Sequence, residues 1–283
     1  MNKKITVWLT LTLVLSFSTV SYGEQKEISC FTKSGKLGVS HPNYECSISP
    51  GGLVNLSLAK SDGSTSPICN SLGIISLTVL REGKQEAVYL DGKWTTQKSL
   101  LKKQTPEEII IQQINEYKNP EKGLDISLIT EIHFYRDQVY FEIAETFLNK
   151  GAETSFGWIG FYNTPSNSLN RVVVMDEKLG KQEAGVVSLA LKPAPAFYGS
   201  LAAESSSFIY ASDAEGWQVE FSSPDRYPLF YAFTSVGDSY YIHYLEYTGR
   251  CFNEEKKRTG AFTLLPDETF SFTVRITPGP LSL

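Results

Sequence analysis

Apolar and polar residues alternate along most of this chain, in stretches that predict β-strands. From Phe270 to Thr277, aromatic and β-branched residues alternate with Ser, Thr and Arg. Successive side chains of a strand point to opposite faces, so this stretch predicts a half-buried strand. Residues 126–135 and 139–143 alternate in the same way on either side of Arg136-Asp137-Gln138. That arrangement predicts a long β-hairpin.

Similar segments are spread over the rest of the chain, and Gly and Pro act as scattered turn residues rather than as a linker. We therefore expect an all-β protein of antiparallel sheets, with residues 24–283 forming one domain. The other expected strands are residues 54–59, 73–81, 87–90, 171–175, 186–191, 207–211, 217–221, 229–234 and 240–247.

The segment 105–117 has signals for both a helix and a strand. Thr105-Pro106-Glu107-Glu108 has the composition of a helix start, with an N-cap, a proline at the first position and a capping-box glutamate. The β-branched run Ile109-Ile110-Ile111 follows, and residues 112–115 form no apolar helical face. The balance favours a strand preceded by a turn, with a helix as the alternative.

The first 23 residues have the pattern of an export signal. Lys3 and Lys4 precede the mostly apolar stretch Ile5–Val20, and Ser21-Tyr22-Gly23 offers small residues for cleavage. An N-terminal membrane anchor is the alternative, but the apolar stretch is too short for a stable span. We expect a secreted or periplasmic protein, with no membrane span after the signal is removed.

Charge excludes some classes of partner. Loss of the two signal-peptide lysines takes the net charge from −5 to −7, and the sequence contains no basic cluster. Binding to nucleic acid or to an anionic membrane needs such a cluster, so neither is expected.

All four cysteines, Cys30, Cys46, Cys69 and Cys251, follow the export signal. An even number in an oxidising compartment predicts two disulfides, for which three pairings are possible. We favour Cys30–Cys46, which closes a short loop, and Cys69–Cys251, which ties the N-terminal region to the last sheet. Their spacing fits no zinc site, and we expect neither a metal nor a cofactor.

Four short motifs follow one another along the chain. They are the Gly51-Gly52 turn, the segment Asn149-Lys150-Gly151, the aromatic stretch Phe156–Asn163 and the turn Leu265-Pro266-Asp267-Glu268. Their order resembles the galactose-mutarotase-like superfamily, the β-supersandwich fold of aldose epimerases and of related domains in polysaccharide-active enzymes, although Asp267 stands where the family usually has Gly. The resemblance implies an antiparallel β-supersandwich, and the length of about 260 residues favours it over a jelly-roll or immunoglobulin-like sandwich.

The resemblance also implies paired acid–base chemistry by a carboxylate and an imidazole. The family's histidine follows the Asn-Gly segment, whereas residues 157–162 contain none. Among the three histidines, His41 is expected at the surface and His133 in mid-strand. His243 and Glu246 are the catalytic candidates, but their spacing places them on opposite faces of a regular strand. A solvated Glu246 paired with Arg250 is an equal alternative.

Aromatic residues support a saccharide site more directly. Sugar rings have apolar C–H faces that stack on aromatic rings, and hydroxyls that need polar partners. Trp158, Tyr162 and Asn163 provide both in one Gly-flanked segment, although Trp158 could instead belong to the core. Arg171 and Arg250 complete the candidate binding set, with an ordinary strand-edge charge as the alternative for Arg171. Tyr198 and Trp217 are second-rank stacking candidates.

These residues lead to three functional hypotheses. The first is an exported, monomeric carbohydrate-binding protein with a mono- or oligosaccharide in a concave aromatic groove. The second is a carbohydrate-active enzyme, either an epimerase-like isomerase or a polysaccharide lyase. The third is a non-catalytic structural or interaction module of the cell envelope.

Overall fold

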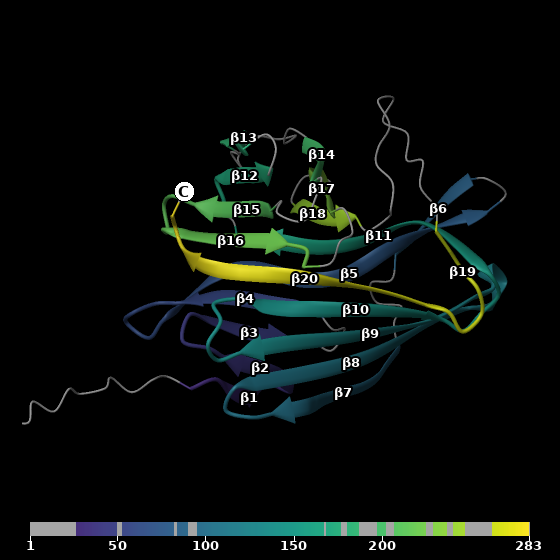
Figure 1. Cartoon of the computed structure of the whole chain (residues 1–283), viewed down its shortest axis with the longest axis horizontal. Coiled ribbons are helices and arrows are strands. Elements are labelled where there is room, and N and C mark those ends of the chain that lie inside the picture. Colours follow the sequence, from purple (N-terminus) through teal and green to yellow (C-terminus); the bar gives the residue numbers. More distant parts are fainter. Residues whose placement is uncertain are drawn as a thin grey trace, which may run out of the picture.

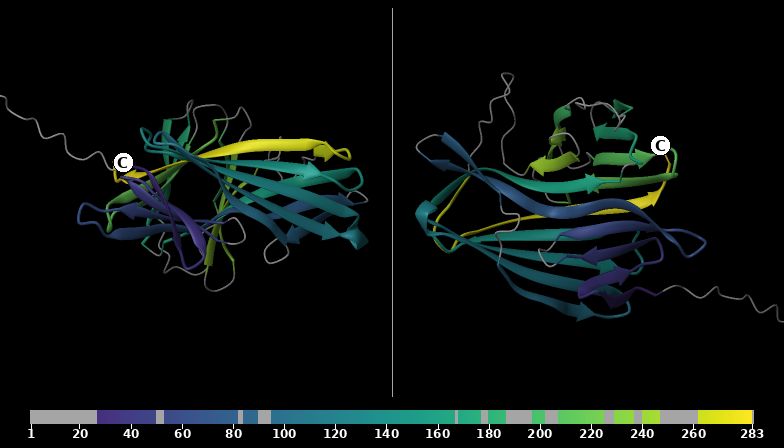
Figure 2. Two further views of the ribbon diagram at one scale, coloured as in Figure 1. Left: turned by 90° about the horizontal axis from the view of Figure 1, so that it is seen from below. Right: turned by 180° about the vertical axis from the view of Figure 1, so that it is seen from behind.

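Two large antiparallel sheets pack face to face in the computed structural model of the chain (Figure 1). Figure 2 shows the same two layers from below and from behind. Their strands confirm the expected all-β class. The structure describes residues 27–49, 53–81, 84–89, 95–166, 168–176, 180–186, 197–201, 207–224, 229–236, 240–246 and 262–282.

The larger sheet has eleven strands in the part of the chain that is described, with the main order β1-β2-β3-β4-β5-β11-β18-β17-β14. Strand β6 pairs with β5, and β19 pairs with β11. The strands are β1 (Ser29–Lys33), β2 (Lys36–Ser40), β3 (Tyr44–Ile48), β4 (Val54–Ala59), β5 (Thr65–Arg81), β6 (Lys84–Tyr89), β11 (Thr154–Pro165), β14 (Phe197–Leu201), β17 (Leu229–Val236), β18 (Tyr240–Glu246) and β19 (Phe262–Leu264).

Among the described residues, the second sheet has nine strands in the order β13-β12-β15-β16-β20-β10-β9-β8-β7. A single 3-10 turn, η1 (Pro120–Lys122), connects β8 to β9. The strands are β7 (Thr95–Gln104), β8 (Glu108–Asn119), β9 (Leu124–Tyr135), β10 (Phe141–Asn149), β12 (Arg171–Asp176), β13 (Gly180–Val186), β15 (Ser207–Ser212), β16 (Trp217–Ser222) and β20 (Thr269–Pro280).

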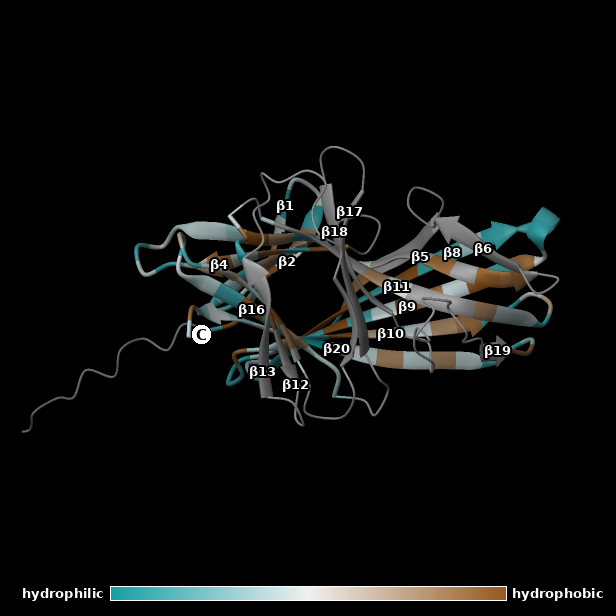
Figure 3. Cartoon of the chain, turned by 90° about the horizontal axis from the view of Figure 1, so that it is seen from above, coloured by the Kyte–Doolittle hydropathy of each residue, from teal (hydrophilic) through white to brown (hydrophobic). Residues whose placement is uncertain are grey.

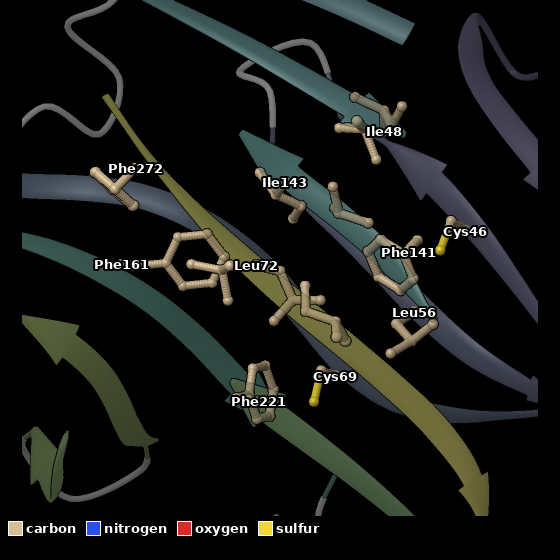
Figure 4. Close-up of a cluster of buried hydrophobic side chains, with 14 of the residues drawn as sticks. Cys46, Ile48, Leu56, Cys69, Leu72, Phe141, Ile143, Phe161, Phe221 and Phe272 are labelled. Carbon is tan, nitrogen blue, oxygen red and sulfur yellow. The ribbon is translucent and has the colours of Figure 1, made fainter. Parts of the chain in front are cut away.

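The core lies between the sheets and is built from alternate residues of their strands. Phe141 of β10 lies beside Leu56 of the larger sheet in one buried cluster, which also contains Ile143, Phe161 and Leu72 (Figure 4). Each of these side chains is at most 1% exposed. Burial of one such side chain is worth roughly 1.5–3 kcal/mol. Figure 3 shows hydrophobic bands along the long strands, separated by more polar positions.

The predicted hairpin and closing strand are confirmed. Strand β9 pairs with β10 in a regular register from Phe134↔Phe141 to Ile126↔Asn149, and β10 pairs with β20. Buried and less buried residues alternate along all three strands. The period-two pattern therefore identified the face that packs against the other sheet.

The ambiguous segment forms strand β8, as favoured from the sequence. Thr105, which has the composition of a helix cap, instead closes the β7–β8 hairpin. Its hydroxyl accepts a hydrogen bond from the Glu108 N–H at 3.1 Å, and its own N–H donates to the Glu108 carbonyl at 2.9 Å. A side chain that can cap a helix thus serves a turn when a β-branched run follows.

Two of the sequence motifs meet around Asn149, which is fully buried. Its side-chain amide donates hydrogen bonds to the carbonyls of Ala152 at 2.8 Å and Leu264 at 2.9 Å. Its backbone carbonyl accepts a hydrogen bond from the Asp267 N–H at 2.7 Å. The Asn149-Lys150-Gly151 segment therefore anchors the turn that leads into the closing strand.

Gly151 and Asp267 have different backbone requirements in this junction. A Cβ at Gly151 would lie 2.9 Å from the backbone nitrogen of Asp125, so the close approach requires glycine. Asp267 has a φ of 65°, in the left-handed region that favours glycine. The turn Leu265-Pro266-Asp267-Glu268 therefore has the left-handed backbone conformation that a glycine would adopt, and aspartate is one of the residues that tolerate it.

The predicted Cys30–Cys46 disulfide is wrong. Val39 pairs with Cys30 on one side and with Cys46 on the other, so a whole strand separates the two thiols. Two strand spacings amount to about 9–10 Å, whereas bridged Cα atoms lie roughly 4.4–6.8 Å apart. No disulfide joins any two of Cys30, Cys46 and Cys69, and burial raises the pKa of the Cys46 and Cys69 thiols. Cys251 lies outside the described residues, so the Cys69–Cys251 pairing stays a prediction.

The expected signal peptide, residues 1–23, and the Gly51-Gly52 turn also lie outside the described part of the chain. Within that part, no helix has the length and apolar character needed to cross a membrane.

Candidate functional site

The structure brings several sequence-predicted site residues onto neighbouring strands of the larger sheet. Strand β11 carries Trp158, Tyr162 and Asn163, and strand β18 carries His243 and Glu246. The two strands pair antiparallel, with Asn163 opposite His243 and Gly160 opposite Glu246 (Figure 1). Segments about eighty residues apart in the sequence are therefore adjacent in the sheet.

The backbone around these positions is irregular on the β5 side of β11. The pairing of β11 with β5 shifts register at the steps 156/158, 160/161 and 162/164. Opposite Tyr162, Gly73 has a φ of 149°, and nearby Ser71 has a φ of 58°. The Ser71 N–H donates a hydrogen bond to Asn55 Oδ1 at 3.2 Å, which supports this uncommon conformation. Bulges and strained residues are enriched next to functional sites, because they re-aim side chains.

On the β17 side, strand β18 is regular. Its register runs without a shift from Tyr240↔Val236 to Glu246↔Phe230. No bulge therefore interrupts the three-residue interval between His243 and Glu246. The expectation that positions 243 and 246 belong to opposite faces agrees with this regular backbone. Phe161, the neighbour of Tyr162, is fully buried and belongs to the core.

Arg171 lies apart from β11 and β18, at the start of β12 in the second sheet. Its Nη1 forms an ion pair with Asp213 Oδ1 at 3.1 Å. Asn170 holds the same carboxylate, donating from Nδ2 to Asp213 Oδ2 at 3.1 Å. The guanidinium thus braces the β15–β16 loop, and a saccharide-binding role for Arg171 stays a prediction. Arg250 lies outside the described residues.

Trp217 is a core residue, so the prediction of a stacking platform there is wrong. Its side chain is fully buried, and its indole N–H donates to Glu215 Oε2 at 3.1 Å. The same carboxylate oxygen accepts a hydrogen bond from the Ser66 hydroxyl of β5 at 2.8 Å. Glu215 therefore links the β15–β16 loop to the larger sheet.

The expectation that His41 lies at the surface is also wrong, since it is only 4% exposed. Its Nδ1 accepts a hydrogen bond from the Asn43 N–H at 3.2 Å, and its Nε2 lies 3.4 Å from the Arg136 carbonyl. The ring stacks on Tyr44 with a centroid distance of 4.3 Å. Burial lowers the pKa of His41, and an Nδ1 that accepts a hydrogen bond fits the neutral ring. His41 thus joins the two sheets.

Glu145 is a buried carboxyl that the sequence analysis did not single out. It is 1% exposed, and its Oε2 accepts a hydrogen bond from the Thr130 hydroxyl at 2.6 Å. Burial raises the pKa of Glu145 to about 8. The sequence could have indicated this burial, because Glu145 alternates in phase with Ile143 and Phe147 on the inward face of β10.

A cavity of about 310 Å³ opens between β5, η1 and the start of β11. None of the predicted site residues lines it; its walls include Val79, Lys122, Glu153 and Thr154. In the described part of the chain, no group of three His, Cys, Asp or Glu side chains could hold a metal ion.

Comparison with protein-family models gives no match, and no curated protein matches the sequence. Solved structures do match. A galactose mutarotase-like protein from Clostridium acetobutylicum has a TM-score of 0.59 and 12% identity, over 90% of this chain and 99% of the other. A galactose mutarotase related enzyme from Lactobacillus acidophilus has a TM-score of 0.53 and 12% identity, over 88% of this chain and 100% of the other.

A galactose mutarotase-like protein from Lactobacillus casei has a TM-score of 0.53 and 10% identity, over 86% of this chain and 100% of the other. At such identities the likeness concerns the fold. The order of strands, the two facing sheets and these matches agree with the fold that the sequence motifs resemble. The described chain has the galactose-mutarotase-like β-sandwich fold.

Proposed function

We propose that this chain is an exported carbohydrate-binding protein whose saccharide site lies on β11 and β18. One observation carries the proposal: the register shifts of β11 coincide with the segment that bears Trp158, Tyr162 and Asn163. A regular strand has no register shifts. Bulges are over-represented next to active sites, where they change the direction of a side chain. The fold of the chain, found in mutarotase-like proteins, agrees with a sugar ligand.

The residue types of the site suit a sugar. Trp158 and Tyr162 offer rings for stacking, and Asn163 offers an amide for hydroxyl groups. Tyr244 and His243 face Tyr162 and Asn163 in the register, which adds polar residues from the neighbouring strand.

An enzyme of the epimerase type is the second candidate, because Glu246 and His243 lie on the strand that pairs with β11. Such an enzyme needs a proton acceptor and a proton donor at one anomeric centre. The regular register of β18 opposes a direct pair of these two residues. Polarimetry of freshly dissolved α-D-glucose and α-D-galactose, with wild type and Glu246→Gln, separates catalysis from binding.

Tryptophan fluorescence tests the binding site. After signal removal the chain contains Trp94, Trp158 and Trp217, and the buried Trp217 provides a constant background. We expect a saturable change in emission with a mono- or oligosaccharide, lost in Trp158→Phe and retained in Trp94→Phe. Tyr162→Ala should weaken binding about tenfold, whereas Lys118→Ala, an exposed position, should not. No response to any sugar, or an unchanged response in both Trp158→Phe and Tyr162→Ala, would overturn the site.

The export part of the proposal is supported by the pattern of residues 1–23. N-terminal sequencing of the protein from its native host should find a chain that begins near Glu24. An intact Met1 in the cell interior would contradict export without affecting the binding test.

A further inference from the structure

The outward face of the second sheet carries a continuous band of aromatic and planar polar side chains. The band is separate from β11 and β18, which belong to the other sheet. The register aligns His133 of β9, Glu142 of β10 and Arg275 of β20 in one row. Their neighbours along the chain are buried in the core, so this row points away from the sandwich. We call Glu108, His133, Tyr135, Tyr140, Glu142 and Arg275 the tyrosine–arginine face.

One half of this face is built around Glu142. Arg275 donates to Glu142 Oε1 from Nη2 at 2.7 Å and from Nε at 2.9 Å. The Tyr135 hydroxyl donates to the second oxygen, Glu142 Oε2, at 3.1 Å. The guanidinium carbon of Arg275 lies 4.2 Å from the centre of the Tyr140 ring. Arg275 is therefore held between a carboxylate and an aromatic ring, and its geometry is fixed before any ligand arrives.

The other half is built around His133. Its Nδ1 lies 3.3 Å from Glu108 Oε1, and its Nε2 lies 3.6 Å from Glu131 Oε2. The rings of His133 and Tyr135 stack with a centroid distance of 6.4 Å, and those of Tyr135 and Tyr140 meet at 5.7 Å and 67°. These ring contacts join the two halves into one surface.

The chemistry of the face favours a sugar over a protein partner. Arg275 is 36% exposed and Glu142 is 17% exposed, so the ordered groups are partly open to solvent. The fully buried centre of a protein interface is more apolar than the rest of a protein surface. The large hydrophobic residues exposed in the described chain, Leu101, Val139 and Leu265, come from three separate loops and strands and form no such centre.

Charge further narrows the ligand class. Glu108 pairs with Lys103, Glu131 with Lys102, and Glu142 with Arg275. Since each carboxylate has a cationic partner, the face offers balanced charge, fixed hydrogen-bonding groups and two phenol rings. We propose that the tyrosine–arginine face is a second saccharide-binding surface that takes an uncharged oligosaccharide. The choice of a saccharide as ligand rests on the proposed function. The position of the tyrosine–arginine face on the second sheet does not depend on β11 and β18.

Titration calorimetry of the full mature chain tests this surface. The probes are cello-, manno- and galacto-oligosaccharides, with an oligogalacturonate as the charged comparison. Tyr140→Ala removes a ring and should weaken binding of an uncharged probe about tenfold. Tyr140→Phe keeps the ring and should retain binding, which separates ring loss from misfolding. Thr146→Ala, on the same outward face but outside the band, is the matched control.

The outcomes separate the two sites. Binding that falls in Tyr140→Ala but not in Tyr162→Ala establishes the tyrosine–arginine face whether or not β11 binds sugar. Binding that falls only in Tyr162→Ala overturns this second surface and leaves the proposed function intact. Preference for the oligogalacturonate would overturn the assignment of an uncharged ligand. Absence of binding to every probe in the wild type would overturn the surface.

Discussion

The Asn149 carbonyl accepts a hydrogen bond from the Asp267 N–H at 2.7 Å, which joins the end of β10 to the turn before β20. The Asn149 N–H donates in return to the Glu268 carbonyl at 3.0 Å. The side-chain amide of Asn149 also serves the Leu264 carbonyl, and Asn149 is fully buried. One asparagine therefore determines how the closing strand enters the second sheet.

Replacement of Asn149 by Ala should destabilise the fold strongly. The substitution leaves the buried Leu264 carbonyl without its amide donor, and the exposed Ala152 carbonyl keeps only the Thr154 hydroxyl as a donor. A buried acceptor without a partner costs about 1–3 kcal/mol and an ordinary lost hydrogen bond about 1 kcal/mol, so we expect a loss of roughly 2–4 kcal/mol in the free energy of unfolding. Urea denaturation measures it. Lys150→Ala, which removes only a partly exposed pair with Glu116, should cost about 1 kcal/mol or less. Equal losses in the two variants would contradict this role of Asn149.

Substitutions at Asp267 should rank by their tolerance of a positive φ. The backbone there has a φ of 65°. A β-branched residue is strained in this region, so Asp267→Val should lower the free energy of unfolding by about 1–2 kcal/mol. Asp267→Gly should be at least as stable as the wild type, within about 0.5 kcal/mol. Thermal unfolding of both variants gives the ranking, and a Val variant as stable as the Gly variant would show that the turn rearranges.

Glu145 should make the protein less stable as pH rises. Its folded pKa is raised to about 8 from an ordinary value of 4.5. Between these values the folded chain holds a proton that the unfolded chain releases, so stability falls with rising pH and levels off above about pH 8. Glu145→Gln removes this dependence and keeps an acceptor for Thr130. The difference in unfolding free energy, variant minus wild type, should therefore grow from about pH 5 to pH 8. A constant difference would refute the raised pKa.

His41 should contribute the opposite dependence at acid pH. Burial lowers its folded pKa below the ordinary value of 6.5. The unfolded chain then binds a proton first as pH falls, so stability is lost from about pH 6.5 downward, until the folded pKa is passed. His41→Phe keeps a ring beside Tyr44 but cannot titrate. It should be less stable than the wild type near pH 8, because it loses two hydrogen bonds, and the gap should narrow near pH 5. A gap that widens in acid would contradict a neutral, buried His41.

Period-two alternation was enough to predict β9, β10 and β20, because one face of each must pack against the other sheet. The same argument fails for residues whose partners are distant in the chain. His41 contacts the carbonyl of Arg136, 95 residues away, so its own loop sequence looked solvent-exposed. Trp217 resembled a stacking residue by type alone, and only the packing of β16 shows that it is buried.

The candidate site was predicted only as a set of residue types. The segment Phe156–Asn163 does not indicate that His243 lies opposite Asn163. The two residues are about eighty positions apart, and their pairing depends on the path of the chain between them. The tyrosine–arginine face was missed for a related reason. Arg275 and Glu142 come from strands that are neighbours in the sheet but far apart in the sequence.

The row Cys30, Val39, Cys46, Leu56 and Cys69 runs across five successive strands, with a thiol on every second one. Thiols spaced in this way cannot meet while the register holds, because an aliphatic residue separates each neighbouring pair. Oxidation of the folded sheet therefore forms no bridge among these three. A disulfide between any two of them would therefore show that the chain was oxidised before β2 or β4 had taken its place in the sheet.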